Sequence, residues 1–396
     1  MIHKETTIRD RQPRWWLLLS FLMAASITVH AQSEYFVYED EGETIITGLA
    51  NTIEASRAKK LTIPAKVTTV KSGALTYAST SLTDLIIEDG GNPAFETALF
   101  GSSTNTLTTI NMGNAMTVAN MAALLKSVEA FNEGTTIEAW GFSGEKDTGS
   151  SVWSGVTWDN VASITLPAEL IGDQAFGSAK VFGRFYINKE LISFCTSATF
   201  LDSSGSNMLF YVADSREADG RLHIQRVRYI AKGKGVLIHK TENSSGYADL
   251  ERTESINDAA ANIEQAKTDL AFYNSNMLVG VTEATSIGKT EVKDNVTYTN
   301  YVLKDGAFYP TSGGTIKANR AYLQLPASAT AHDGLLDISF DEVTTGIRTA
   351  NSTNSDAIYD LQGRYVGRLT DSSLFIFHPS HNKGLYIKNG KKYVVR

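Results

Sequence analysis

Residues of the types that carry catalysis are sparse and widely separated along this chain of 396 residues. The sequence contains no Gly-x-Ser-x-Gly elbow, no His-Glu-x-x-His motif and no Cys-x-x-Cys pair. Gly233-Lys234-Gly235 is too short for a phosphate-binding loop, and no helix start follows it. His378 and His381 offer two imidazoles without an evident third metal ligand nearby. The sequence therefore predicts no catalytic residue, no metal site and no cofactor, and hence a protein that is not an enzyme.

Two further features have a structural explanation that is simpler than a chemical one. Cys195, the one cysteine, lies in the strand-like run 191–195, where a buried and inert thiol is expected. The acidic run 39–43 lacks the ligand spacing of a calcium loop and predicts a solvated turn. Two carboxylates about 5 to 9.5 Å apart would suffice for a glycosidase, and a sequence does not reveal such a pair. A carbohydrate-active hydrolase is therefore kept as a third hypothesis.

The amino-terminal segment 1–31 has the composition of a signal peptide. Four basic residues precede an apolar run from Trp15 to Val29, and cleavage is expected between Ala31 and Gln32. The run is shorter than the roughly 20 residues that cross a bilayer, and no other run is longer. The sequence therefore predicts an exported protein with no transmembrane segment after cleavage, located at the cell surface, at the outer membrane or outside the cell.

The charge and cysteine content narrow the class of partner and the source of stability. The leader has a net charge of +2 and the whole chain −7, so the mature chain carries −9. This acidity argues against nucleic acid as a partner. A single cysteine leaves no intramolecular disulfide, so a mature chain of this size must rely on its hydrophobic core.

A short apolar–polar–apolar motif recurs in the amino-terminal half. Its copies end at positions 63, 87, 112 and 166, so the steps are 24, 25 and 54, and the last step equals about two repeats: Leu61-Thr62-Ile63, Leu85-Ile86-Ile87, Ile110-Asn111-Met112 and Ile164-Thr165-Leu166. Each copy predicts a strand with one buried face, which only stacking on its neighbours can cover. The phrases LTIPAKVTTVKSGAL and ITLPAELIGDQAF resemble the BspA-like leucine-rich repeat. The resemblance covers about residues 43–178, and it implies a short, irregular leucine-rich-repeat-like solenoid and a link to adhesion.

The segment between the third and fourth copies interrupts the repeat. Helical spacing of apolar residues predicts a helix over 117–131. Trp140, Trp153 and Trp158 follow, separated by Gly and Ser. Exposed Trp residues on loops are typical of carbohydrate and partner contacts, whereas Trp packed beneath a long loop is the structural alternative. We take these three tryptophans as a hypothetical binding loop of domain 32–180.

Residues 181–345 change to short strand-like runs and predict an antiparallel β-sandwich-like domain. One helix is expected to interrupt it, capped by Ser255, with Ile256, Ala260, Ile263 and Leu270 near one face. The order of phrases such as LFYVAD, AKGKGVLIHK and YVLKDGAFYP resembles a β-rich module of exported proteins from anaerobic Gram-negative bacteria.

The end of the chain predicts a small β-hairpin domain at 357–396 after a linker at 346–356. Asn389-Gly390 between two alternating strands is a strong hairpin signal. The pairing of IYDLQGR with GLYIKNGKKYVV resembles the sorting tails of type IX secretion cargo. The residues that match the pattern of those tails are Gly384, Tyr386, Lys392 and Arg396.

Taken together, the sequence predicts a mainly β, secreted or surface, adhesin-like binding protein. Its partners would be host or bacterial surface proteins or glycans. The alternative hypothesis is a structural component of an extracellular or surface assembly without a soluble ligand.

Overall fold

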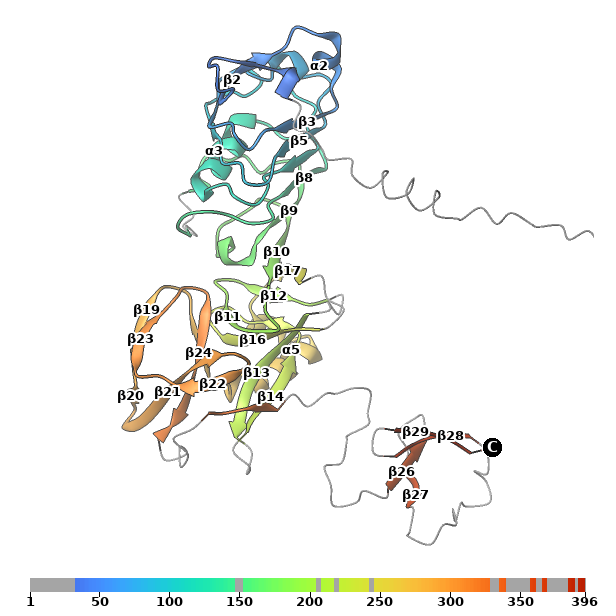
Figure 1. Ribbon diagram of the computed structural model, residues 1–396, viewed down its shortest axis with the longest axis vertical. Helices are drawn as coiled ribbons and strands as arrows, with labels where there is room; N and C mark the ends of the chain where they lie inside the picture. The colour runs from blue at the N-terminus through green and yellow to red at the C-terminus, as the bar shows by residue number, and fades with distance from the viewer. Residues whose placement is uncertain are drawn as a thin grey trace, which may run out of the picture.

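The computed structural model describes residues 33–146, 152–203, 208–216, 221–241, 246–327 and 335–339, and the backbone of four carboxyl-terminal strands at 357–360, 365–368, 384–388 and 391–395. The expected signal peptide with Ala31 and Gln32, the expected linker and Arg396 lie outside these residues. The described chain is mainly β (Figure 1).

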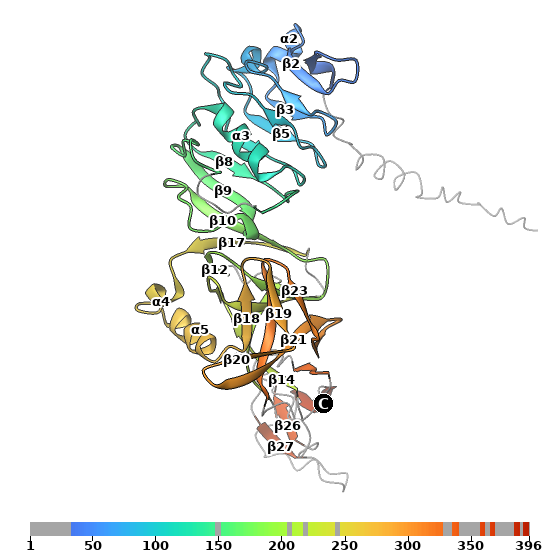
Figure 2. The same cartoon turned by 90° about the vertical axis from the view of Figure 1, so that its left-hand side faces the viewer.

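Six successive strands form the parallel part of a nine-stranded sheet, which we call the parallel stack: β3 (Lys60–Ile63), β5 (Asp84–Ile87), β7 (Thr109–Asn111), β8 (Thr135–Glu138), β9 (Val161–Pro167) and β10 (Lys180–Tyr186). Leu61 lies beside Leu85, which lies beside Ile110. These side chains are fully buried and alternate with residues that are polar except for Ile86, so one face of every strand points into the core. Figure 2 shows the strands stacked one after another along the long axis.

Each turn of the chain also contributes to the opposite side of this core. There β2 (Ile45–Leu49), β4 (Thr69–Val70) and β6 (Ala94–Phe95) form a second parallel sheet, with β1 (Phe36–Tyr38) antiparallel at its edge. Ile46, Val70 and Phe95 are in register and buried. Two short helical segments connect strands of one sheet to strands of the other: α2 (Ile53–Arg57) joins β2 to β3, and η2 (Thr76–Ala78) lies between β4 and β5 in the sequence. The two segments contact each other.

The helix α3 (Val118–Val128) replaces a strand of this second sheet and packs against β6. Thr117 caps it, since its hydroxyl accepts a hydrogen bond from the Asn120 N–H at 3.2 Å. The apolar residues whose spacing predicted this helix are at most 3 % exposed: Val118, Met121, Leu124, Leu125 and Val128. The expected helix over 117–131 is therefore confirmed, although it ends at Val128, before the expected carboxyl end.

The long interval between Ile110 and Ile164 contains a strand that the repeat motif did not indicate. In β8, Ile137 is paired with Ile110 on one side and Ile164 on the other, and it lies midway between them in the sequence. Ala139 occupies the second apolar position of the motif and is fully buried. The other copies of the motif have a large apolar residue at that position, so the sequence pattern did not identify this copy, which has a small one.

Side-chain hydrogen bonds between neighbouring turns reinforce the stack. Asn132 donates to the carbonyl oxygens of Asn105 at 3.2 Å and Leu107 at 2.9 Å. Asn105 donates to the Ala130 oxygen at 2.9 Å, and Asn160 donates to the Phe131 oxygen at 3.0 Å. One of these three side-chain amides precedes each of the strands β7, β8 and β9. They satisfy carbonyl groups in the connections before the strands, where no sheet partner is available.

The parallel stack continues directly into the second module. Strand β10 pairs in parallel with β9 and in antiparallel with β17 (Tyr247–Thr253). The sheet goes on through β12 (Thr199–Leu201) to β15 (Tyr229–Ile230). The expected domain boundary at 180/181 thus falls at the start of a shared strand, and one buried apolar cluster runs across it.

The second module contains antiparallel sheets, as predicted for this half of the chain. One sheet runs β11-β16-β13-β14, with β25 parallel at its edge, and the other runs β18-β24-β21-β20, with β22 beside β21. A β19-β23 ribbon adds a third sheet. An apolar cluster drawn from both larger sheets includes Tyr211, Leu237, Phe308 and Leu323. The strand bounds are β11 Leu191–Cys195, β13 Met208–Arg216, β14 Leu222–Val227, β16 Gly235–Lys240, β18 Leu278–Val281, β19 Thr285–Gly288, β20 Thr290–Lys293, β21 Val296–Lys304, β22 Ala307–Pro310, β23 Gly313–Ile316, β24 Arg320–Pro326 and β25 Ile338–Ser339.

The single helix expected after Ser255 is two helices, so this prediction was wrong. Ser255 caps α4 (Ile256–Ala259), and α5 (Glu264–Asn274) follows. Ile263 has extended backbone at the start of α5 and is 43 % exposed, not part of a common face with Ile256. The apolar spacing is compatible with one helix, but a turn at 260–262 resets the phase between the two segments.

The four carboxyl-terminal strands form one antiparallel sheet in the order β27-β26-β28-β29. Strands β28 (Gly384–Lys388) and β29 (Lys391–Val395) are paired from Lys388 with Lys391 outwards. They flank Asn389-Gly390, as the sequence predicted for a hairpin. Strands β26 (Ala357–Asp360) and β27 (Tyr365–Arg368) complete the sheet.

Candidate functional site

The outer face of the parallel stack carries the side chains that alternate with the buried ones. In register across the strands, its two rows are Lys60, Asp84, Thr109, Thr136, Ser163 and Lys180, and Thr62, Ile86, Asn111, Glu138, Thr165 and Phe182. Most of these side chains are polar, and strands a few ångströms apart present them as a continuous surface. A flat, hydrogen-bonding face of this kind is suited to contact with a macromolecule.

At its carboxyl end this face changes into a cluster around one arginine. Arg184 of β10 lies opposite Asp249 of β17, and its Nε and Nη2 each donate to one Asp249 carboxylate oxygen at 2.8 Å. The guanidinium carbon lies 3.7 Å from the centroid of the Trp140 ring, on the loop that follows β8. Such a bidentate pair with a stacked aromatic ring holds the guanidinium in one orientation.

A second carboxylate extends the cluster back along the stack. Glu138 lies 3.6 Å from Arg184 Nη2, and it accepts a hydrogen bond from Asn111 at 2.7 Å. Burial disfavours the charge on Arg184, but the hydrogen bond and charge of Asp249, together with Glu138, raise the pKa of the guanidinium above its ordinary value. Arg184 is therefore a permanent cation, although only 5 % of it is exposed. It lies in what we call the joint, where β10 pairs with β9 of the stack on one side and with β17 of the second module on the other.

One donor of this guanidinium, Nη1, is buried without a hydrogen-bond partner among the described residues. An unsatisfied buried donor costs about 1–3 kcal/mol. The Trp140 ring face offers a compensating cation–π attraction of about 2 kcal/mol at a desolvated site. Trp140 and Arg184 therefore depend on each other for their positions.

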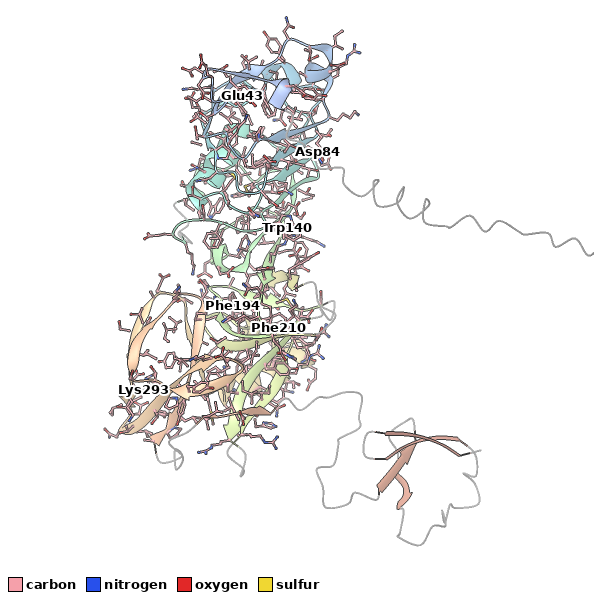
Figure 3. All side chains as sticks on the ribbon, in the orientation of Figure 1. Glu43, Asp84, Trp140, Phe194, Phe210 and Lys293 are labelled. Carbon is pink, nitrogen blue, oxygen red and sulfur yellow. The ribbon has the colours of Figure 1, made fainter. Side chains whose placement is uncertain are left out.

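Two aromatic rings lie near the guanidinium carbon of Arg184, with centroids at 3.7 Å for Trp140 and 5.8 Å for Tyr247. These two rings and that of Tyr186, two residues after Arg184 in β10, are open to solvent. Tyr247 packs edge-to-face against Trp140 with centroids 5.1 Å apart, and Tyr186 is its cross-strand neighbour. Trp140 is 42 % exposed, Tyr247 40 % and Tyr186 65 %. We call Trp140, Tyr186 and Tyr247 the aromatic cluster; Figure 3 labels Trp140 at the level where the stack meets the second module.

The structure does not bring the three tryptophans of the hypothetical binding loop together on one surface. Trp153 is 3 % exposed and packs against Trp158 and Phe176, with centroids 6.1 and 6.3 Å apart. Trp158 is half-buried and lies 5.0 Å from Phe176. These two rings close the apolar core at the end of the stack, so only Trp140 contributes to the exposed cluster.

Sequence reasoning missed Arg184, Tyr186, Tyr247 and Asp249. The alternation in each of the runs Arg184-Phe185-Tyr186 and Tyr247-Ala248-Asp249 is a signal that could have placed their outer residues on one face of a strand. The pairing of two strands that lie far apart in the sequence was not readable, however, and that pairing makes the cluster.

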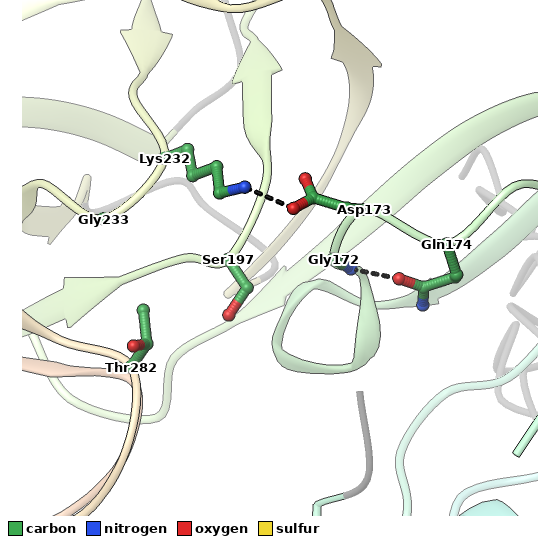
Figure 4. A pocket seen from close by; sticks show the side chains of 7 residues that line it. All are labelled: Gly172, Asp173, Gln174, Ser197, Lys232, Gly233 and Thr282. Atoms are coloured by element: carbon green, nitrogen blue, oxygen red, sulfur yellow. Dashed lines mark hydrogen bonds and ion pairs between the residues drawn. The ribbon is translucent and has the colours of Figure 1, made fainter. Parts of the chain in front are cut away.

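A cavity of about 470 Å³ opens on another side of the joint (Figure 4). Residues 172–174 line it from the stack, and Ser197, Lys232, Gly233 and Thr282 line it from the second module. Lys232 is ion-paired with Asp173, and Gln174 accepts the Gly172 N–H at 2.7 Å. This lining supplies one carboxylate, already paired, where glycoside hydrolysis requires two.

Other sequence-based expectations about chemistry can be placed. Cys195 is fully buried, so the expected burial of this thiol is confirmed, and burial raises the pKa of the thiol to about 12. Within the described ranges no group of three or more His, Cys, Asp and Glu side chains is arranged to hold a metal ion. The same residues include no helix long and apolar enough to span a membrane. His378 and His381 lie outside the described residues.

Strands β28 and β29 place the backbone of the expected sorting residues Gly384, Tyr386 and Lys392 in one antiparallel pair.

Comparison with known proteins found no matching family model, no similar curated protein and no similar solved structure.

Proposed function

We propose that this protein is an exported, non-catalytic binding protein whose parallel stack presents its outer face to a surface protein or glycan. The single observation that carries this proposal is the outer face of six parallel strands, whose in-register side chains are mostly polar and which ends in exposed aromatic rings. Interaction surfaces in stacked-repeat proteins are built in this way, because alternate side chains from every repeat reach the same side.

In this proposal the stack is a leucine-rich-repeat-like solenoid of the BspA-like kind. The nearly equal sequence steps from Leu61 to Leu85, Ile110 and Ile137 support it, as do the threonine and asparagine hydrogen bonds between turns. The antiparallel module would serve as a scaffold that holds the stack away from the surface. Residues 1–31 would direct export, and the carboxyl-terminal sheet would act as a sorting or attachment element similar to those of type IX secretion cargo.

The test is binding of purified mature protein, residues 32–396, to immobilised matrix proteins and glycans. The substitution Thr136→Arg introduces a bulky cation in the centre of the outer face. It should weaken binding at least tenfold, because the new side chain holds a flat partner away from the strands. Ser56→Arg, on α2 away from this face, is the matched control. Wild-type binding by Thr136→Arg, or no binding partner for the mature protein, would contradict the proposal.

A further inference from the structure

We propose that the aromatic cluster of Trp140, Tyr186 and Tyr247 binds a pyranose ring of a neutral glycan. This inference names a ligand class for one end of the outer face and so rests on the proposed function. The site lies across the joint between β8, β10 and β17, and neither half of the chain forms it alone.

The first argument is the exposure of the rings. Single exposed apolar side chains are ordinary, but here Tyr186 and Tyr247 are partners on two paired strands and Trp140 packs against Tyr247 from the loop after β8, and each keeps 40 % to 65 % of its surface exposed. Ring faces provide flat apolar area with little loss of side-chain entropy on binding, since two χ angles define each ring. The C–H face of a pyranose matches such an area.

The second argument is the polar groups beside the rings. Sugar sites combine aromatic side chains with a few convergent polar groups. The carboxylates of Asp249 and Glu138 are 32 % and 35 % exposed, and each keeps lone pairs beyond those used by Arg184 and Asn111. They are placed to accept hydrogen bonds from sugar hydroxyls while a ring lies on the aromatic cluster.

The third argument is charge, which separates neutral from acidic glycans. Arg184 provides one positive charge, and Asp249 and Glu138 provide two negative charges, so the site carries a net −1. Nε and Nη2 of the guanidinium are engaged by Asp249, and its unpartnered Nη1 is buried, so a ligand carboxylate or sulfate does not reach a free donor. Sialylated and sulfated glycans would therefore meet uncompensated like charge.

The fourth argument is preorganisation. Trp140 is fixed by the guanidinium on its face and by Tyr247 against its edge, and the tyrosines stand on paired strands. A site on rigid elements loses little entropy when the ligand binds. Arg184 is thus a positioning residue and does not itself contact the sugar.

The experiment is a screen of the mature protein on an array that carries neutral hexose and N-acetylhexosamine oligosaccharides beside their sialylated and sulfated counterparts. The strongest neutral oligosaccharide is then titrated by calorimetry and by tryptophan fluorescence, to which Trp140 contributes directly. We expect retention of neutral glycans, and Tyr186→Ala and Trp140→Ala should each lower affinity at least tenfold. Tyr77→Ala, an even more exposed tyrosine on η2, should bind as the wild type does.

Tyr186→Ala is the decisive variant because its ring is the most exposed of the three and contributes least to folding. Retention of sialylated or sulfated glycans only, no retention of any glycan, or unchanged affinity in Tyr186→Ala would each overturn the inference. If no glycan is retained, or if Tyr186→Ala binds with unchanged affinity, the aromatic cluster has only a structural role at the contact between the stack and the second module. If a matrix protein still binds and Thr136→Arg still weakens it, the inference alone has failed; if nothing binds, the proposed function has failed as well.

Discussion

The parallel stack and the antiparallel module form their hydrogen bonds in different ways. In the stack, strands pair with the next turn of the chain, as with Leu61 and Leu85 or Ile110 and Ile137. In the module, bonds also join distant segments, such as Asn319 to the Cys195 oxygen and the Ala321 N–H to Ser193, 124 and 128 residues apart. Each strand of the stack therefore depends on the strands next to it, whereas the module depends on contacts between segments that are distant in the sequence.

This difference has consequences for stability. A stacked array distributes its free energy of unfolding over repeat-to-repeat interfaces, so damage to one turn has a local effect. A module with long-range pairing is expected to fold slowly and to unfold as one unit. The two regions share β10 and one apolar cluster, so the joint determines how far these behaviours remain separate.

The largest effect is expected from Phe185→Ala, at the centre of the joint. Its ring lies 5.3 to 5.6 Å from the rings of Phe194, Phe200 and Phe210, and it is 2 % exposed. Truncation of a buried Phe costs about 3–5 kcal/mol in free energy of unfolding. Chemical denaturation should show the loss in circular dichroism and also in tryptophan fluorescence.

Tryptophan fluorescence of residues 32–396 reports on the stack and the joint only, because Trp140, Trp153 and Trp158 are the only tryptophans in that part of the sequence. A fluorescence transition that stays at its wild-type midpoint in Phe185→Ala would show that the two regions unfold independently despite their shared strand.

A slightly smaller and more local effect is expected from Ile137→Ala in β8. Ile137 is 2 % exposed between Ile110 and Ile164, and removal of such a side chain costs roughly 2–5 kcal/mol. Hydrogen exchange should accelerate in β7, β8 and β9 and stay slow in β13 and β16. Thr136→Ala, the exposed neighbour, is the control, and equal acceleration in both regions would remove the distinction between them.

Asn132→Ala tests whether amide hydrogen bonds between turns support the stack. It removes the donor to the Asn105 and Leu107 oxygens. The Leu107 oxygen keeps the Thr135 hydroxyl at 3.2 Å, so the cost of about 1–3 kcal/mol arises mainly at Asn105. The thermal midpoint followed by tryptophan fluorescence should fall. Glu133→Ala, at the adjacent exposed position, should not change it, and an unchanged midpoint in Asn132→Ala would mean that water replaces these bonds without cost.

The smallest effect concerns Cys195, which reports on opening of the module without altering it. Burial raises the pKa of the thiol to about 12, so the reactive thiolate stays scarce until the pH rises well above neutral or the module opens. Alkylation at mildly alkaline pH should be slow in the wild type and in Ile137→Ala, and faster in Phe185→Ala. Rapid alkylation of the native wild type would show that the module opens locally around β11.

Much of the fold was readable because local patterns repeat or are strong. The alternation around Leu61, Leu85, Ile110 and Ile164 predicted four strands of the stack, and the apolar spacing after Thr117 predicted α3. β8 was missed because Ala139 replaces the large residue of the motif. The split between α4 and α5 was missed because a short turn preserves an approximate helical spacing of apolar residues.

The candidate site was only partly predictable. Trp140 was singled out for its residue type, and the structure separates it from Trp153 and Trp158, since burial depends on what a loop packs against. Arg184, Tyr186, Tyr247 and Asp249 were not singled out, because cross-strand pairs form between segments whose register no local pattern fixes.

By itself the sequence determined which side of each strand is apolar, where the turns of the stack begin, and that a chain with one cysteine relies on its core without intramolecular disulfides. These are local properties of residue type and spacing. Only the tertiary structure decided that β10 joins a parallel sheet to an antiparallel one, and that an arginine, two carboxylates and three aromatic rings meet there. The physical reason is that contacts between distant segments depend on how the whole chain packs.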